Sequence, residues 1–229
     1  MRNQKTPTVI AVIPCLNEEH FIADIVNRAK KYVDMVIVID DGSTDSTAMT
    51  ARNAGAQVIS HPVSMGAGAA TRSGFMKAMN DGADIVVTLD GDGQHNPDEI
   101  PLLIERAVTE NADLVIGSRF SGADVKIKRY RKFGIDVITF LYNIGASVKI
   151  TDSQSGFRAY SRRLLENIRI TENGFGFSVQ VIIQARNKGM KISSVPITCI
   201  YHEDGSTLNP VRHGLGVAFA VVKHRLLRS

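Results

Sequence analysis

The stretch Ile85-Val-Val-Thr-Leu-Asp-Gly-Asp-Gly-Gln-His95 joins a predominantly apolar, β-branched run directly to a pair of carboxylates. Such a run is typical of a strand that is buried on both faces of a parallel sheet. Asp90 and Asp92 follow where this strand is expected to end. In open sheets of this kind, ligands bind beyond the carboxyl ends of the strands. The stretch therefore predicts both an α/β sheet and a polar site at the edge of that sheet.

Similar apolar runs lie on both sides of this stretch, and segments with helical spacing separate them. The predicted strands are Val9–Ile13, Met35–Ile39, Gln57–Ile59, Ile85–Leu89 and Leu114–Ile116. The predicted helices are Glu18–Tyr32, Asp45–Asn53, Ala67–Met79 and Asp98–Val108. Alternation of strand and helix at this spacing indicates a doubly wound, mainly parallel sheet.

After Arg119 the alternation becomes less regular. A basic loop (122–132) precedes an amphipathic segment that extends to Lys149, and a turn-rich stretch, Thr151–Tyr160, follows. A helix is predicted at Val179–Lys188, a strand at Lys191–Ile200 and a helical tail at 209–228. We expect one domain, 1–229, in which residues 1–119 form a ligand-binding half and residues 120–229 shape the rest of the site.

The composition limits the class of protein. The chain has 229 residues, of which 44% are hydrophobic and 22% charged, as in an ordinary globular domain. The net charge of +4 suits an anionic substrate or an anionic membrane face, and equally a solvated surface; we expect no nucleic-acid partner. Cys15 and Cys199 form no CxxC pair and are expected to be reduced core thiols.

Targeting and membrane signals also bear on location. No secretion signal is visible, and no run reaches the roughly 20 apolar residues that a membrane-spanning helix needs. The tail from Gly214 mixes apolar and basic residues, which suits either a helix lying in an anionic interface or a helix packed on the domain. We expect a cytoplasmic protein that associates peripherally with the cytoplasmic face of a membrane.

Two further polar clusters follow predicted strands, namely Pro14-Cys-Leu-Asn-Glu18 and Asp40-Asp-Gly-Ser43. The second cluster could also be a simple helix cap, because serine and aspartate are good N-cap residues. The carboxylates of Asp90 and Asp92 are harder to explain in this way. Two carboxylates at such a short distance repel one another unless a cation or a proton offsets their negative charge. Carboxylates are also the usual ligands of hard divalent cations.

The segment Gly66-Ala-Gly68-Ala-Ala-Thr71 is a weak match to a dinucleotide-binding fingerprint. Thr71 stands in place of the third glycine, and the segment does not open the first βα unit. Two interpretations remain open. The small residues could let the backbone approach a base or a ribose, or they could let a helix pack closely.

Taken together, several motifs resemble those of the family 2 inverting glycosyltransferases, and within these the dolichyl-phosphate mannose and glucose synthases. They cover nearly the whole chain in the expected order. The motifs are Pro14–Glu18, Val38–Ser43, the Gly66 segment, Leu89–His95, Gly117–Arg119 and Ser155–Tyr160. The stretch Gly205–Gly214 is similar to an archaeal-type branch of the polyprenyl-phosphate enzymes.

The resemblance implies a GT-A fold with a donor site and an acceptor site. A nucleotide-diphosphate sugar would be bound by Pro14, Leu16, Glu18, Asp40, Asp41, Asp90 and Gln94. Mg²⁺ or Mn²⁺ would be held by Asp90, Asp92 and Gln94. Catalysis would rest on Asp92, Arg119 and Arg131; Arg129 could join the acceptor site, and Arg158 would help to assemble it.

Two positions depart from the family pattern. Gln180 stands where many relatives carry glutamate, and His202 stands in place of the usual arginine near the end of the last strand. Arg212 or His213 could supply the contact that is missing at His202. With Gln180 unable to act as a base, Asp152 is the remaining candidate for that role.

The implied reaction moves a hexose from a donor such as GDP-mannose or UDP-glucose to a polyprenyl (dolichyl) phosphate, with inversion at the anomeric carbon. A phosphate acceptor fits Gln180, because a phosphate monoester is already ionised near neutral pH and needs no base. Three alternatives remain. They are a transferase acting on a glycan hydroxyl, a sugar-phosphate nucleotidyltransferase, which normally begins with a Gly-rich basic loop, and a non-catalytic sugar-nucleotide-binding protein.

Overall fold

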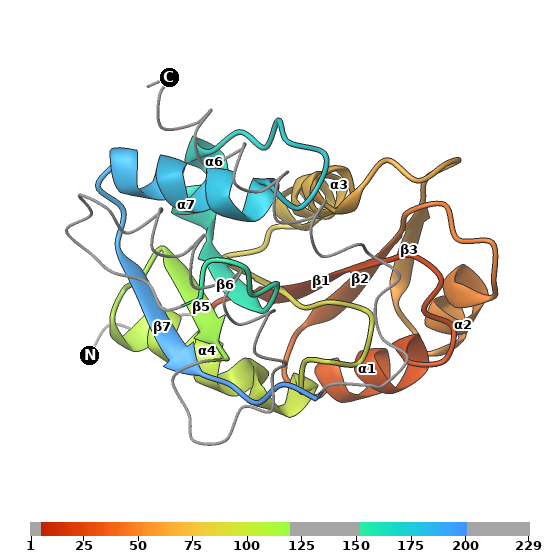
Figure 1. Ribbon diagram of the computed structural model, residues 1–229. Helices are drawn as coiled ribbons and strands as arrows, with labels where there is room; N and C mark the ends of the chain where they lie inside the picture. The colour runs from red at the N-terminus through yellow and green to blue at the C-terminus, as the bar shows by residue number, and fades with distance from the viewer. Residues whose placement is uncertain (1–5, 120–151, 201–229) are drawn as a thin grey trace.

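The computed structural model describes residues 6–119 and 152–200. Within these residues seven strands form one sheet in the order β3-β2-β1-β4-β6-β5-β7 (Figure 1). The strands are β1 (Val9–Cys15), β2 (Met35–Asp40), β3 (Gln57–Ser60), β4 (Ile85–Thr88), β5 (Leu114–Ser118), β6 (Arg158–Ser161) and β7 (Ile192–Pro196). The predicted α/β sheet is confirmed, and every strand expected before Arg119 is present.

The pairing is mainly parallel, as predicted, with one exception. β1 pairs in parallel with β2 and β4, β2 with β3, and β5 with β7. β6 is antiparallel to both of its neighbours, β4 and β5. The prediction of turns throughout Thr151–Tyr160 was therefore wrong for its last residues. Arg158 and Ser161 are polar and leave only Ala159 and Tyr160 between them, so no apolar run marks β6 in the sequence.

Helices cover both faces of the sheet. They are α1 (Ile22–Ala29), α2 (Thr47–Asn53), α3 (Ala67–Asn80), α4 (Ile100–Thr109), α6 (Arg162–Asn167) and α7 (Phe177–Asn187), with a 3₁₀ turn η1 (Pro97–Glu99) before α4. The first helix is shorter than the predicted Glu18–Tyr32, and α6 was not predicted. α1 begins late because residues before it form a loop in which the carbonyl of Glu18 accepts the N–H groups of Phe21 and Ile22.

Alternate residues of β1 point into two separate cores. Ile10 and Val12 belong to the core beneath α3, α6 and α7, whereas Ala11 and Ile13 belong to the core beneath α1, α2 and α4. Figure 1 shows these two groups of helices on opposite faces of the sheet. The packing is closest at Gly74 of α3, where an added Cβ would lie 3.3 Å from Cγ1 of Ile39 and still nearer to Val12. The central strands are therefore buried on both faces, as their apolar runs predicted.

Several predictions fall on residues 120–151 and 201–229, which lie outside the described part of the chain. They include the roles of Arg129, Arg131, His202, Arg212 and His213, and the tail after Gly214. Among the helices in residues 6–119 and 152–200, none combines the length and apolarity that a membrane crossing requires.

Candidate active site at the carboxyl edge of the sheet

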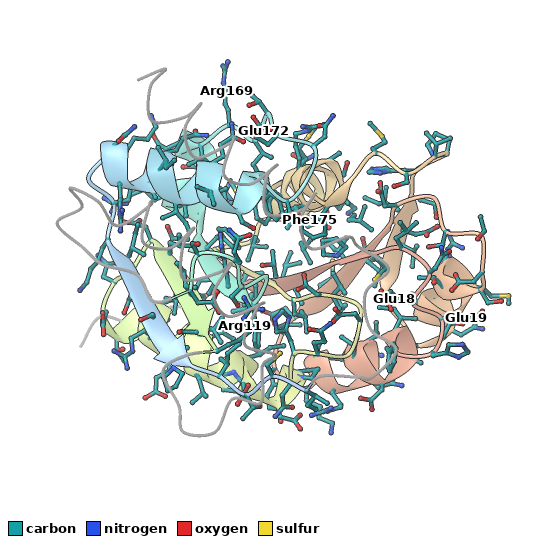
Figure 2. The ribbon with its side chains drawn as sticks, viewed as in Figure 1. Glu18, Glu19, Arg119, Arg169, Glu172 and Phe175 are labelled. Atoms are coloured by element: carbon teal, nitrogen blue, oxygen red, sulfur yellow. The ribbon has the colours of Figure 1, made fainter. Side chains whose placement is uncertain are left out.

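The carboxyl ends of β1, β2, β4 and β5 all lie at one edge of the sheet, because these strands run in the same direction. This edge carries the loop after β1 with Leu16 and Glu18, the end of β2 at Asp40, Asp90 just after β4, and Arg119 just after β5. Figure 2 labels Glu18 and Arg119, which mark the β1 and β5 parts of this edge. The fold thus brings together residues that are distant in the sequence.

Four carboxylates converge on the thiol of Cys15 at the end of β1. Burial raises the pKa of this thiol well above its usual value, and the charges of Glu18, Asp40, Asp90 and Asp92 raise it further. The thiol is in contact range of Gly91, where an added Cβ would lie 2.5 Å from its sulfur. The acidic residues predicted from three separate motifs therefore form one cluster of negative charge.

Asp90 occupies a cradle that the loop before β6 provides. A Cβ added to Gly156 would lie 2.7 Å from Cγ of Asp90, so only glycine leaves room for this carboxylate. Half of the Asp90 side chain (52%) is open to solvent. Partial desolvation raises its pKa, which Arg119 and Arg158 oppose. The segment 155–158, which the resemblance assigned to the acceptor side, thus also fixes the position of Asp90.

His95 closes the loop that carries both carboxylates. Its Nδ1 accepts the backbone N–H of Asp90 (3.2 Å), and the carboxylate of Asp92 accepts the N–H of Gln94 (3.0 Å). The imidazole is buried against the ring of Phe157, with ring centroids 5.4 Å apart. Burial is the largest cause that lowers its pKa to about 4, so the ring is neutral near pH 7. No sequence pattern indicates this role, since the imidazole meets the ring of Phe157 only in the fold.

The acidic cluster fits a divalent cation. The pKa of Glu18 is raised to about 7, first by desolvation and then by the charges of Asp92, Asp45 and Asp90. The part of this pKa shift that comes from neighbouring carboxylates indicates a concentration of negative charge, which a bound cation would offset. Among the described residues, no group of three His, Cys, Asp or Glu side chains could hold a metal. Asp90 and Asp92 would therefore supply part of the ligand set, and water and diphosphate oxygens the remainder, as is common for Mg²⁺.

Arg119 lies at the other end of the edge, in a bidentate ion pair with Asp152. Its Nε donates to one oxygen of this carboxylate (2.7 Å) and a terminal nitrogen donates to the other (2.9 Å). Asp152 is fully buried. Burial alone would raise its pKa, but Arg119 and the backbone N–H groups of Arg119 and Gln154 hold it below the ordinary value. Both oxygens of Asp152 are engaged in this way, which argues against the role of general base that we considered for it.

Arg158 is completely buried beside this pair and holds the backbone together. Its guanidinium donates to the carbonyls of Ser155 (2.8 Å), Ser178 (2.9 Å) and Ser153 (2.8 Å). One side chain therefore links the loop that precedes β6 to the start of α7. This arrangement agrees with the expectation that Arg158 helps to assemble the acceptor side.

The loop after β1 is tied to the loop after β2. The N–H of Asn17 donates to Ser43 Oγ (2.9 Å), and the N–H of Glu18 donates to Thr47 Oγ1 (2.7 Å). Asp40 accepts the N–H of Ser43 (3.0 Å). Between these loops Leu16 remains 44% exposed at the edge, and Pro14 lies within β1 just before it. Pro14, Leu16, Glu18 and Asp40 are thus adjacent. The carboxylate of Asp41 faces the loop after β3, where it contacts His61 Nδ1 (2.6 Å) and accepts the N–H of Gly66 (2.8 Å).

The segment Gly66–Thr71 is explained by packing. The N–H groups of Gly68 and Ala69 donate to the carbonyl of Asn173 (2.7 and 3.2 Å). An added Cβ would lie 2.5 Å from this carbonyl oxygen at Gly66, and 2.9 Å from the Gly174 carbonyl oxygen at Gly68. The backbone that approaches the small residues belongs to the loop 172–174. These contacts support the interpretation that the small residues let the helix pack closely.

Gln180 has a structural role in the same region. Its Oε1 accepts the N–H groups of Thr171 (3.0 Å) and Glu172 (3.2 Å), and its Nε2 donates to Thr171 Oγ1 (2.6 Å). The side chain is buried. Thr171 and Glu172 belong to the loop that packs on the start of α3. The residue that replaces glutamate here therefore holds a loop in place. A neutral amide suits this role, because its oxygen accepts the two backbone N–H groups and its nitrogen donates to the hydroxyl group.

The cradle at Gly156 gives a direct test of the metal site. In Gly156→Ala the methyl group is expected to displace the Asp90 carboxylate, and the affinity for Mn²⁺ should fall by about tenfold or more, a cost near 1.4 kcal/mol. Titration of Mn²⁺ followed by electron paramagnetic resonance measures this affinity. The matched control is Gly174→Ala, because a Cβ there meets nothing within 4 Å. Equal Mn²⁺ affinity in the two variants would contradict the cradle.

The sequence matches the family model described as glycosyl transferase family 2 over residues 10–169. It is 32% identical over 220 residues to the UDP-N-acetylglucosamine–dolichyl-phosphate N-acetylglucosaminyltransferase of Methanococcus voltae, covering 85% of this chain and 86% of that protein. It is 31% identical over 242 residues to the undecaprenyl-phosphate mannosyltransferase of Micrococcus luteus, covering 95% and 98%.

A solved structure has the same fold. Glucosyl-3-phosphoglycerate synthase from Mycobacterium tuberculosis, in complex with Mn²⁺, UDP and phosphoglyceric acid, superposes with a TM-score of 0.74. The two chains are 25% identical, and the match covers 97% of this chain and 78% of the synthase.

Proposed function

Because this chain belongs to glycosyl transferase family 2, we propose that it moves a hexose, with inversion, from a nucleotide-diphosphate sugar to a polyprenyl phosphate. One observation carries the proposal. The acidic cluster that contains Asp90 and Asp92 lies at the same edge of the sheet as the guanidinium of Arg119. The cluster follows β4 and the guanidinium follows β5, and β6 lies between these two strands. In our proposal the acidic cluster binds the cation and Arg119 binds the acceptor phosphate, so both would face one edge of the sheet.

The acidic cluster forms the donor side. When bound, Mg²⁺ or Mn²⁺ would supply Lewis acidity for the departure of the diphosphate. In our proposal Asp90 and Asp92 hold this cation, with Gln94 on the same loop. The donor, of the GDP-mannose or UDP-glucose type, extends from there along the ends of β1 and β2. Leu16, Glu18 and Asp40 line that part of the edge.

Arg119 forms the acceptor side. Its guanidinium is held by Asp152, so it is already oriented before a substrate arrives. A phosphate monoester has its second pKa near ~6, and at pH 7 it is largely the dianion. Such an acceptor attacks without a protein base, which agrees with the engagement of Asp152 and with the structural role of Gln180. The relatives from Methanococcus voltae and Micrococcus luteus are named for lipid phosphate acceptors.

A lipid acceptor places the reaction at a membrane surface. We propose a peripheral association with the cytoplasmic face, which suits the net positive charge of the chain. A glycan hydroxyl is the second candidate acceptor. It needs a positioned general base, and the carboxylate that pairs with Arg119 is already occupied by that arginine.

The acceptor class is tested with a short polyprenyl phosphate and the corresponding polyprenol. We expect transfer with inverted anomeric configuration to the phosphate in the presence of Mn²⁺ or Mg²⁺, and at least about 100-fold less transfer to the alcohol, since an alcohol lacks the ionised nucleophile. Product formation is followed with a radiolabelled donor, and the configuration by nuclear magnetic resonance. Efficient transfer to the alcohol or to a glycan would refute a phosphate acceptor. Full activity in excess chelator would refute the cation.

A further inference from the structure

We propose that Glu99 is a positioning residue for the cation site. It acts through the segment 198–200, which it holds against the loop that carries Asp90 and Asp92. The inference rests on the proposed function for the identity of the cation. The contacts among Glu99, the segment and the loop are independent of it.

The carboxylate of Glu99 binds the first residue of the segment. Both of its oxygens accept the backbone N–H of Thr198 (3.1 Å each), and Oε1 also accepts the hydroxyl group of Thr198 (3.1 Å). Glu99 is the N-cap residue of α4, a position where a side chain often accepts an N–H of the helix, yet its side chain makes no cap hydrogen bond. The carboxylate therefore serves the contact with Thr198 and not the end of the helix.

The turn η1, which ends at Glu99, is fixed independently of the segment. Oδ2 of Asp98 accepts from Nη2 of Arg28 in α1 (2.7 Å), and Oδ1 accepts from the hydroxyl group of Tyr32 (3.2 Å). The side chain of Asn96 accepts the N–H of Asp98 (3.2 Å) and closes the turn. Glu99 thus extends from a base that is attached to α1, so it can hold the segment in a defined place.

The segment pairs with the loop that follows β4. The N–H of Ile200 donates to the carbonyl of Gln94 (2.9 Å), and Cys199 forms an isolated antiparallel bridge with His95. The segment is therefore a short added strand on the backbone of residues 94 and 95.

Each of these two loop residues is bonded to a residue of the carboxylate pair. The imidazole of His95 accepts the N–H of Asp90, and the carboxylate of Asp92 accepts the N–H of Gln94. A shift of the backbone at 94–95 would therefore displace both carboxylates. Groups that orient metal ligands without touching the metal commonly change its affinity by about 10–100-fold when they are lost.

Few other contacts hold the segment in place. The N–H of Ile197 donates to the carbonyl of Ser118, the last residue of β5 (3.0 Å). The chain thus crosses the edge of the sheet from β5 to the loop after β4, and Glu99 binds it between these two ends. Ile200 is 50% exposed, so burial of apolar surface contributes little to its position. The hydrogen bonds to Glu99 are accordingly the main restraint in the middle of this path.

The test compares the wild type with Glu99→Ala, Glu99→Gln and Thr198→Val. Glu105→Ala is the matched control, because Glu105 is an exposed glutamate on α4, the helix that follows Glu99. The dissociation constant of Mn²⁺ alone is measured by electron paramagnetic resonance. Amide hydrogen exchange is followed in peptides covering 90–96 and 197–200, and the melting temperature is recorded for each variant.

We expect Glu99→Ala to accelerate exchange in both peptides and to weaken Mn²⁺ binding by about tenfold. Glu99→Gln should stay within about threefold of the wild type, because the amide oxygen can accept the N–H of Thr198 and the amide nitrogen can donate to its hydroxyl group. Thr198→Val removes only the hydroxyl group and should also stay within about threefold. Glu105→Ala should match the wild type in exchange and in Mn²⁺ affinity.

Kinetics separate positioning from a general loss of stability. In Glu99→Ala the KM for Mn²⁺ should rise by about tenfold, while kcat at saturating Mn²⁺ stays within about threefold of the wild type, because the bound cation restores the arrangement of Asp90 and Asp92. A variant that was merely less stable would lose active protein at every Mn²⁺ concentration and leave this KM unchanged.

Three results would overturn the proposal. They are unchanged exchange in Glu99→Ala, accelerated exchange with wild-type Mn²⁺ affinity, and a loss of Mn²⁺ affinity in Glu99→Gln as large as that in Glu99→Ala, which would make the charge of Glu99 responsible. A wild-type protein that binds no Mn²⁺ would instead refute the cation of the proposed function. The exchange data would then still decide whether Glu99 holds the segment 198–200 on the loop.

Discussion

Replacement of Asp92 by asparagine is expected to lower the rate of sugar transfer by about 100-fold or more while the protein remains folded. The carboxylate lies in an acidic cluster whose repulsion raises the pKa of Glu18, so removal of its charge relieves strain in the absence of metal. The same change weakens the site for a cation that stabilises the leaving diphosphate, an effect worth several kcal/mol, of which about 2.7 kcal/mol corresponds to 100-fold. Transfer to polyprenyl phosphate is measured together with the melting temperature.

Asp24→Asn provides the control, because Asp24 is an exposed carboxylate on α1 that forms an ion pair with Arg28, away from the acidic cluster. This variant should retain wild-type activity. An Asp92→Asn protein that turns over at a normal rate, or one that binds Mn²⁺ as tightly as the wild type does, would remove Asp92 from the cation site.

The second large effect is expected at Asp152. In Asp152→Asn the amide would face the guanidinium of Arg119 with an N–H group in place of one carboxylate oxygen. Removal of one charge from a buried pair costs about 3–5 kcal/mol. We expect the acceptor KM to rise by about 100-fold or more and the stability to fall, with little change in donor affinity. Because Asp152 acts here by holding Arg119, the pH dependence of kcat should keep its shape.

Asp113→Asn is a matched control for this loss of a buried charge. Asp113 is buried and pairs with Arg163, but it precedes β5 and so lies at the opposite edge of the sheet. Its replacement should reduce stability and leave the acceptor KM unchanged. If instead Asp152→Asn lost the acidic limb of the pH–rate profile at an unchanged acceptor KM, Asp152 would be a general base and the acceptor a hydroxyl group.

The sequence was sufficient for those parts of the fold that depend on local pattern. Strands buried on both faces are apolar runs, and their carboxyl ends are known once their direction is known, which is why Glu18, Asp90 and Arg119 could be assigned to one edge. β6 could not be recognised in the same way, because its stability comes from pairing with one strand on each side, β4 and β5, and from the three carbonyls that Arg158 binds.

The contacts that sequence reasoning missed share a different property. His61 and His95 have partners that only the fold brings to them, such as Asp41 and the ring of Phe157. The resemblance implied that Asp41 contacts the nucleoside, and in the structure its carboxylate faces the loop after β3. Adjacent residues at a strand end can point in opposite directions, and sequence alone cannot assign a partner to each of them.

The position of β6 has a consequence for the order of folding during synthesis. β5 leaves the ribosome without a partner strand in the described sheet, since it pairs only with β6 and β7, both of which are made later. Until residues 158–161 are available, β4 likewise has one unpaired edge. The nascent chain can complete the β3-β2-β1-β4 portion early. The ion pair of Arg119 and the cradle for Asp90 form only after Asp152 and Gly156 have been synthesised. A chain released at residue 119 would therefore expose an apolar strand with two open edges, which is a hazard for aggregation.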